Sequence, residues 1–258
     1  MSVSEEKISS IDRALDILIL FHTEGKELGV TEIGSALGLY KSTVYRTLAT
    51  LEKRGFVQQN TENGKYWLGI KIYALGMAVG EKMHLKRIIQ PYAKRLSEKF
   101  NEVVNVSVLD TTSEKFPRSV LILKEEIPSQ VLKMTPGIGS SNICYNSATG
   151  KVLLAFSPKE TSERCKEEEI IQSTEKTIKS WDKLFNEIEC IRAKGYAIDN
   201  EEQEIGLTCI AAPILDRNKM IVAAISLSGP TSRVNSRDFE EIVNEVKKVA
   251  AEVSELLK

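Results

Sequence analysis

The sequence is poor in the residues that most often build metal sites and disulfides. Among 258 residues there are two histidines and four cysteines, and the cysteines are scattered without a Cys-x-x-Cys pair. Structural zinc sites need clustered Cys and His ligands, so we expect no metal site. In a cytosolic protein, scattered cysteines are expected to stay reduced.

Catalytic signatures are missing too. No phosphate-binding P-loop, H-E-x-x-H or G-x-S-x-G motif is present, and GIGSS lacks the glycines and the context of a dinucleotide-binding loop. Cys144 and Cys209 could serve as nucleophiles. However, His22 and His84 fall in the first helix and the connecting segment, where neither can pair with them. We therefore expect a protein that is not an enzyme and needs no cofactor.

Long hydrophobic runs are also absent. The best candidate, Leu15 to Phe21, is much shorter than the ~20 residues of a membrane-spanning helix and contains Asp16. The N-terminus, MSVSEEKISS, carries two glutamates and no apolar core, unlike a signal peptide. A composition of 42% hydrophobic and 28% charged residues is ordinary for a soluble globular protein. We expect a cytoplasmic protein that does not interact with membranes.

The charge is unevenly distributed, although the net charge is only −1. Residues 39–71 contain six basic residues against two acidic ones. A local basic surface in an otherwise neutral chain is expected when one segment meets phosphate groups. This segment is therefore a candidate for nucleic-acid binding.

Apolar spacing in the first 69 residues predicts three helices followed by a β-hairpin. The expected helices cover residues 10–22, 30–37 and 41–54, and the expected strands lie at 56–57 and 66–68. In the first helix, the helical period is given by Ile11, Leu15, Leu18 and His22, at i, i+4, i+7 and i+11. The Asn-Gly pair at 63–64 is a strong hairpin signal. This order of elements is that of a winged helix-turn-helix.

The third predicted helix combines an apolar side, with Val44, Leu48 and Leu51, and a polar, basic side. In a helix-turn-helix the second helix lies in the major groove, where Ser and Thr bond phosphates or base edges and Arg pairs with guanine. The residues expected to contact DNA, with one lysine on the hairpin, are Lys41, Ser42, Thr43, Tyr45, Arg46 and Lys65. The alternative is a solvated helix face capped by Ser42, but an exposed tyrosine and the order of helices and hairpin favour DNA.

A second domain is expected after a connecting helix. Residues 70–82 have a helical pattern with Ile70, Tyr73, Ala74 and Met77 on one face, and several glycines suit a connector. The expected domains are 1–69 and 85–258, joined by residues 70–84. In the second domain, helices are expected at 85–100, from 148, at 180–194 and at 239–257, and strands at 103–109, 119–124, 130–134, 209–215 and 220–228. The fold class is therefore α+β.

The second domain also has groups suited to a small anion. A glycine-bearing loop leads into the helix start ATGKVLLAF, where backbone N–H groups make an anion site. Ser226 and Ser228 alternate along one strand, so both hydroxyls point to one face, and Cys209 begins the preceding strand. These groups suit a small organic carboxylate. The alternatives are ordinary strand hydroxyls bonded to neighbouring carbonyls and a cysteine that belongs to the core.

Several stretches together resemble the IclR family of bacterial transcription regulators. Its DNA-binding half is matched by SIDRALDILILF, LGVTEIGSALGLYKSTVYRTLATLEKRGFV and YWLGIKIYALG. Its effector-binding half is matched by NSATGKVLLAF, RAKGYAIDNEEQEIGLTCIAAPILD and MIVAAISLSGP, of which GYAIDNEE followed by GLTCIAAP is the most specific part. The resemblance implies a winged helix-turn-helix, a connector helix and a C-terminal GAF/PAS-like mixed sheet with flanking helices.

The resemblance also implies partners and site residues. It implies a homodimer or homotetramer that binds palindromic, double-stranded promoter DNA under the control of a small metabolite. The implied effector-binding residues are Val131, Met134, Ala148, Thr149, Gly150, Asp199, Cys209, Ser226 and Ser228. Asp199 could instead cap the short helix expected after it. The family often has histidine where this chain has Tyr145; tyrosine is longer and neutral at pH 7, so a different ligand size and charge preference is expected.

These observations predict a sequence-specific DNA-binding transcriptional regulator, either repressor or activator, that is controlled by a small-molecule effector. The alternative is a winged-helix protein-interaction module with a ligand-sensing domain, and the local positive charge favours DNA. One monomer reads few bases, so two winged domains are expected to span half-sites about 34 Å apart, or a multiple of that distance.

Overall fold

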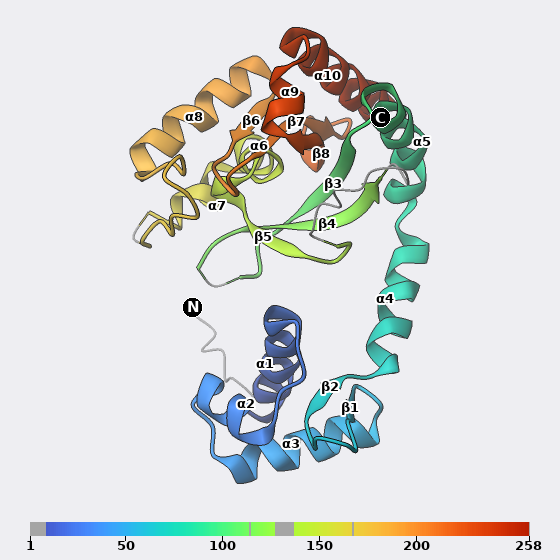
Figure 1. The fold of residues 1–258 in the computed structure, drawn as a ribbon, viewed down its shortest axis with the longest axis vertical. Coiled ribbons are helices and arrows are strands. Elements are labelled where there is room, and N and C mark those ends of the chain that lie inside the picture. The colour runs from blue at the N-terminus through green and yellow to red at the C-terminus, as the bar shows by residue number, and fades with distance from the viewer. Residues whose placement is uncertain (1–8, 114, 127–136, 167, 258) are drawn as a thin grey trace. The chain divides into compact units, whose positions relative to one another are not determined.

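The computed structural model describes residues 9–113, 115–126, 137–166 and 168–257 (Figure 1). The chain folds into two compact units, residues 1–83 and residues 84–258. Val131, Met134 and the strand predicted over 130–134 lie outside the described residues.

The N-terminal unit contains the predicted three helices and hairpin, followed by a fourth helix. Its elements are α1 (Ser9–Glu24), α2 (Val30–Leu37), α3 (Lys41–Lys53), β1 (Val57–Gln59), β2 (Tyr66–Leu68) and α4 (Ile70–Lys82). The two strands are antiparallel, with Val57 opposite Leu68. The winged helix-turn-helix order is thus confirmed.

Helix α1 does not bury all the residues that give its period. Ile17 and Phe21 of α1 are fully buried, whereas Ile11 and Leu15 are 54% and 51% exposed and His22 is exposed. The helix is as predicted, but its period does not identify the buried side. The helix is apolar on more than one side, so its periodicity does not select a face, and the packing of α2 and α3 does.

The hairpin is tied to the helices by side-chain and backbone contacts. The carboxylate of Glu27 accepts hydrogen bonds from the side-chain amides of Asn60 (3.1 Å) and Asn63 (2.8 Å). A backbone bridge pairs Leu28 with Tyr66. These contacts place the turn of the hairpin beside the segment between α1 and α2.

The C-terminal unit is built on one six-stranded sheet. Its strands are β3 (Val103–Asp110), β4 (Arg118–Glu125), β5 (Ser141–Ile143), β6 (Ala197–Asn200), β7 (Leu207–Leu215) and β8 (Ile221–Pro230), in the order β5-β4-β3-β8-β7-β6. All neighbouring pairs are antiparallel, so the expectation of a mixed sheet is wrong. Strand β6 was not predicted, because four residues carry too little periodicity.

Helices cover both faces of the sheet (Figure 1). On one face lie α5 (His84–Phe100) and α10 (Phe239–Leu256), and on the other lies α6 (Ala148–Phe156), against which α8 (Trp181–Lys194) packs. The short elements η1 (Cys144–Asn146), α7 (Lys159–Glu163) and α9 (Thr231–Asn235) complete the unit. The four long helices agree with the predicted ones, which confirms the α+β class.

The alternation of β3 sets up a polar surface between sheet and helix. Val104 and Val106 are fully buried on the face that α5 and α10 cover. Asn105 and Ser107 alternate with them and therefore point to the opposite face, toward α6. The sheet thus has one apolar face and one face that carries hydrogen-bonding side chains.

Helix α6 lies unusually close to the chain before it. A Cβ atom at Gly150 would stand 2.2 Å from the carbonyl oxygen of Cys144. No side chain fits at that distance, so glycine at this position lets α6 pack against η1. The start of α6 is held there over the polar side of the sheet.

We expect Gly150→Ala to destabilise the protein by about 1–3 kcal/mol or more, because the new methyl group must displace backbone. Urea unfolding followed by circular dichroism measures the change. Gly76→Ala in α4 is the control, since a Cβ there meets nothing within 4 Å. It is expected to stabilise α4 by up to about 1 kcal/mol. An unchanged midpoint for Gly150→Ala would contradict the close packing.

Candidate functional site

Helix α3 presents a polar and basic face above a buried apolar one. Val44 and Leu48 are fully buried, while Lys41, Ser42 and Arg46 are exposed. Tyr45 lies on the same outward face and is 60% exposed. The apolar contacts of α3 therefore fix which side chains point outward.

Two of the predicted DNA-contacting residues are less exposed than the others. Thr43 is half-buried. Lys65 lies directly before β2 in the hairpin. Its Nζ is 3.0 Å from the carboxylate oxygens of Glu32. A phosphate near Lys65 would have to share the ammonium group with Glu32.

Sequence reasoning missed an aromatic residue at the start of α3. Tyr40 is the N-cap residue of the helix and is 85% exposed. Gly38, two residues before Tyr40, ends α2 in the left-handed conformation, so the turn that precedes α3 is short. Tyr40 could have been identified from the sequence by its position just after Gly38.

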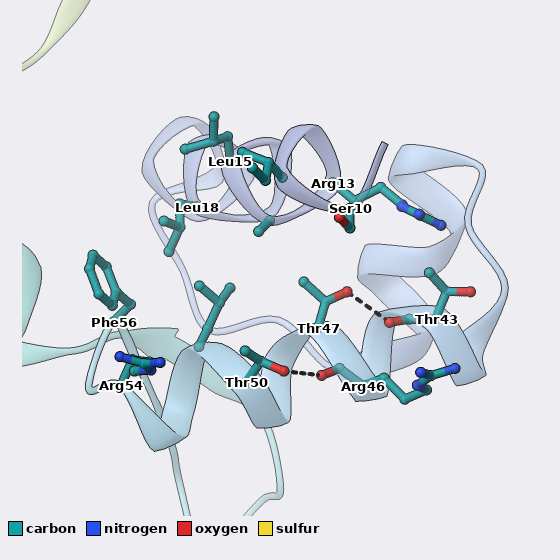
Figure 2. Close-up of a pocket in the computed structure, with 13 residues that line it drawn as sticks. Ser10, Arg13, Leu15, Leu18, Thr43, Arg46, Thr47, Thr50, Arg54 and Phe56 are labelled. Carbon is teal, nitrogen blue, oxygen red and sulfur yellow. Dashed lines mark hydrogen bonds between the residues drawn. The ribbon is translucent and has the colours of Figure 1, made fainter. Parts of the chain in front are cut away.

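A groove of about 610 Å³ runs between α1 and α3 (Figure 2). Leu15 and Leu18 lie on its α1 side, and Thr47 and Thr50 lie on its α3 side. The two threonine hydroxyls donate hydrogen bonds of 2.9 and 3.0 Å to carbonyl oxygens one turn earlier in α3. Arg13, Arg46 and Arg54 also line the groove, whose surface is otherwise largely apolar.

The C-terminal unit has a second, smaller cavity of about 60 Å³ between the sheet and the start of α6. Five of the predicted effector-binding residues line it, namely Ala148, Thr149, Cys209, Ser226 and Ser228. Ser226 and Ser228 are almost fully buried, and their hydroxyl oxygens are 3.5 Å apart. The structure therefore brings together residues that lie up to 80 positions apart in the sequence.

Most of the cavity's polar lining was not predicted. The additional hydrogen-bonding residues are Asn105, Ser107, Ser119, Asn142, Ser147, Gln203 and Glu204. The polar and apolar alternation in VVNVSVLD was the one signal that could have identified the pair on β3. The others come from β4, β5 and loops, and only strand pairing brings them to the same place.

The start of α6 leaves backbone donors at the cavity. Ser147 is the N-cap residue, and its hydroxyl accepts a hydrogen bond from the Gly150 amide (3.2 Å). The amides of Ala148 and Thr149 are in the first turn and have no partner within the helix. These two N–H groups belong to residues that line the cavity, where the helix dipole favours an anion.

Two of the predicted residues do not line the cavity. Gly150 packs against the backbone of Cys144. Asp199 is fully buried, and its Oδ1 accepts hydrogen bonds from the amides of Glu202 (2.7 Å) and Gln203 (3.3 Å). Asp199 therefore caps the turn after β6, which corresponds to the alternative interpretation of this residue.

The turn after β6 is also held by an ion pair. Lys151 of α6 is 1% exposed, and its Nζ lies 2.5 Å from Oε1 of Glu202. Burial raises the pKa of the Glu202 carboxyl, an effect that the ammonium of Lys151 opposes. Within the described residues, Oδ2 of Asp199 and Oε2 of Glu202 are buried without a hydrogen-bond partner.

Tyr145 lies away from the cavity. Its ring packs against Phe116 and Trp181, at centroid distances of 5.4 and 5.9 Å. Its hydroxyl donates to the carbonyl oxygen of Ile171 (3.2 Å) and accepts from the amide of the same residue (2.8 Å). Tyr145 is therefore not among the described residues that line the cavity, and a different ligand preference stays a prediction.

The thiol of Cys209, which lines the cavity, is unreactive at neutral pH. Burial, together with the nearby charge of Asp199, raises the pKa of the Cys209 thiol to about 12. A thiol with this pKa is neutral at pH 7 and a poor nucleophile. Within the described ranges, no group of His, Cys, Asp and Glu side chains is arranged to hold a metal ion.

These features define a class of protein. A winged helix-turn-helix with an exposed polar and basic helix, combined with a domain that holds a small polar cavity, is the architecture of a transcriptional regulator with a ligand-binding domain. The chain belongs to the IclR family. Residues 77–255 match its C-terminal domain, described as "Bacterial transcriptional regulator IclR C-terminal", and residues 10–61 match "IclR helix-turn-helix domain".

Individual relatives agree with this assignment. The chain is 34% identical over 251 residues to the HTH-type transcriptional regulator KdgR of Escherichia coli K12, which covers 96% of this chain and 92% of that protein. The crystal structure of Thermotoga maritima IclR is 31% identical, with a TM-score of 0.69 over 97% of this chain and 99% of that one. An IclR regulator from Alicyclobacillus acidocaldarius has a TM-score of 0.83 at 23% identity, over 98% and 100% of the two chains, which shows the fold alone.

Membership of the IclR family establishes the general function of the chain. The chain is a transcriptional regulator with a helix-turn-helix DNA-binding domain and a C-terminal ligand-binding domain. The relatives are regulators, so the prediction that the chain is not an enzyme is confirmed. In the part of the chain that the structure describes, no helix has the length and apolar character needed to cross a bilayer.

The buried carboxyl of Asp199 predicts a pH dependence. Burial raises its pKa from 3.8 to about 6, so the folded protein holds this proton more tightly than the unfolded chain. The stabilising effect of the proton is complete below pH 3.8 and is lost as pH rises to about 6, by about 3 kcal/mol. Asp199→Asn is expected to remove this loss. Urea unfolding between pH 4 and 7 measures it, and equal pH slopes for both proteins would contradict the prediction.

Proposed function

We propose that the protein is a cytoplasmic homodimer or homotetramer that binds palindromic promoter DNA, and that a small organic carboxylate in the cavity controls this binding. The observation that carries the DNA part is the outward face of α3. Lys41, Ser42, Tyr45 and Arg46 stand together on it, directly above the buried Val44 and Leu48.

The chemistry of this face suits the major groove. Arg46 can make a bidentate contact with guanine, and Ser42 can bond a phosphate or a base edge. Lys41 lies at the N-terminal end of the helix, where helix-turn-helix proteins contact base edges. Thr43 and Lys65, the less exposed members of the predicted set, are better placed for phosphate contacts than for reading bases.

Exposed apolar residues support an oligomer. On α4, the residues Ile70, Tyr73 and Met77 are 75%, 65% and 47% exposed. Apolar side chains at this spacing form a stripe along one side of a helix, and such a stripe is usually covered in the functional assembly. A second copy of the chain would cover it and place two α3 helices for half-sites about 34 Å apart, or a multiple of that distance.

The start of α6 supports a carboxylate effector. The amides of Ala148 and Thr149 can donate to a carboxylate, and the hydroxyls of Ser226 and Ser228 lie across the same cavity. A ligand there would contact α6, the sheet and the turn after β6 together. Effector binding would thus favour one arrangement of the dimer over another, with a coupling of about 1–3 kcal/mol that either strengthens or weakens DNA binding.

Arg46→Ala is expected to weaken binding to the duplex that the wild-type protein selects from a random library by about 5- to 150-fold. An arginine–guanine pair contributes about 1–3 kcal/mol, and random duplex lacks that pair, so its affinity is expected to fall much less. Fluorescence anisotropy at fixed salt measures both affinities. Lys26→Ala removes an exposed positive charge between α1 and α2 and serves as the control. Equal losses on both duplexes would make Arg46 a phosphate contact.

Replacing Ser226 and Ser228 with Ala together is expected to abolish the response of DNA binding to the carboxylate that stabilises the wild-type protein in a thermal-shift screen. The DNA affinity without ligand is expected to stay the same, because both hydroxyls lie in the C-terminal unit. Ser236→Ala is the control, since this exposed hydroxyl bonds only to the nearby carbonyl of Arg233. A normal response from the double variant would remove this cavity from the proposal.

A further inference from the structure

The lining of the cavity constrains the chemistry of its ligand. Most of the lining side chains are neutral hydroxyls and amides, and among the described residues that line it there is no aromatic and no basic side chain. An aromatic ligand would find no ring to stack on. A ligand that forms many hydrogen bonds would find partners on the sheet and on the loops.

One of these polar groups, Oδ1 of Asn105, is buried without a partner among the described residues. Ser107 and Ser119 are 4% and 3% exposed, and both line the cavity. The side-chain nitrogen of Asn105 donates to Ser228 (3.4 Å), but its Oδ1 is buried and accepts nothing from described residues. Because an unmet buried polar group costs free energy, the site is suited to a ligand that bonds these atoms.

The acceptor atoms that line the cavity favour a ligand that carries hydrogen-bond donors. Oδ1 of Asn105 can only accept, and the carboxylate of Glu204, exposed at the edge of the cavity, also only accepts when ionised. A ligand hydroxyl can donate to these atoms and can also accept from the hydroxyls of Ser107 and Ser119. A keto group accepts only, and an alkyl chain does neither.

Charge and size limit the ligand further. The amides of Ala148 and Thr149 provide a place for one carboxylate, whereas Glu204 would repel a second one. The cavity volume is about 60 Å³. This is less than the roughly 150 Å³ of a cavity that holds benzene, so only a small ligand fits.

We propose that the effector is a short monocarboxylate with at least two hydroxyl groups, whose carboxylate lies at the start of α6 and whose hydroxyls bond Asn105, Ser107 and Ser119. This inference rests on the proposed function, because it specifies the ligand of the same cavity. It assigns a role to three side chains on β3 and β4 that sequence reasoning did not select.

Four three-carbon acids test the ligand class on the full-length protein. Glycerate has two hydroxyls, lactate has one, propionate has none, and pyruvate replaces the hydroxyl with a keto group. Isothermal titration calorimetry is expected to give the tightest binding for glycerate, with a loss of about 3- to 10-fold for each hydroxyl removed. Pyruvate is expected to bind no better than propionate. Equal affinities for glycerate, pyruvate and propionate, or tighter binding of the dicarboxylate malonate, would overturn the proposal.

The double variant Ser107→Ala/Ser119→Ala tests the assigned side chains. It is expected to lower the ratio of glycerate to propionate affinity by about 10-fold while propionate binding stays the same. The fold should tolerate the change, because each substitution removes one oxygen atom from a side chain that lines the cavity. Ser236→Ala is the matched control and should keep the wild-type ratio. An equal loss for both acids would mean a structural role and would overturn the assignment.

The outcomes separate this inference from the proposed function. If benzoate or an alkyl acid binds the cavity and changes the affinity for the selected duplex, only the hydroxylated class is wrong. If none of these acids binds while the protein still selects DNA, both the carboxylate effector and this inference fail, and the DNA-binding part remains. Binding of glycerate that also changes the affinity for the selected duplex would support both.

Discussion

The buried ion pair between Lys151 and Glu202 holds together two sides of the polar cavity in the C-terminal unit. Lys151 lies in the first turns of α6, and Glu202 lies in the turn after β6 that also contributes Gln203 to the cavity. Removing one partner of such a pair costs about 3–5 kcal/mol, because the other charge is left in apolar surroundings. Thr177 adds a hydrogen bond of 2.7 Å to the carbonyl oxygen of Glu202. The start of α6 therefore keeps its place across the cavity from the turn, and so do the amides that it offers to a ligand.

The cavity exists because one face of the sheet is not used fully for packing. The face under α5 and α10 is apolar, whereas the face under α6 carries Asn105, Ser107 and Ser119 beside a large apolar cluster. A buried polar group without a partner costs about 1–3 kcal/mol, and among the described residues Oδ1 of Asn105 is such a group. A ligand that bonds this group returns that free energy, which couples its binding to the stability of the fold. Departures from good packing are most often found where a protein binds something.

In the N-terminal unit, the small core determines which side chains of α3 point outward. Val44 and Leu48 anchor α3, so the outward direction of Arg46 and Tyr45 follows from packing rather than from the helix itself. The unit also exposes apolar side chains on α1 and α4 and has an apolar groove between α1 and α3. One set of side chains thus suits DNA and another suits a protein surface. A regulator that binds a palindrome as a pair of chains needs one surface for DNA and another for its second copy.

The sequence alone determined the features that depend on near neighbours. The period of α3, the buried Val44 and Leu48, the hairpin and the start of α6 all follow from side chains and turn residues within a few positions of one another. Only the tertiary structure decided which face of α1 is buried, because that helix is apolar on several sides. It also decided that Asp199 caps a turn and that Ser119 shares a cavity with Ser226, because the pairing of strands far apart in the chain creates those neighbours.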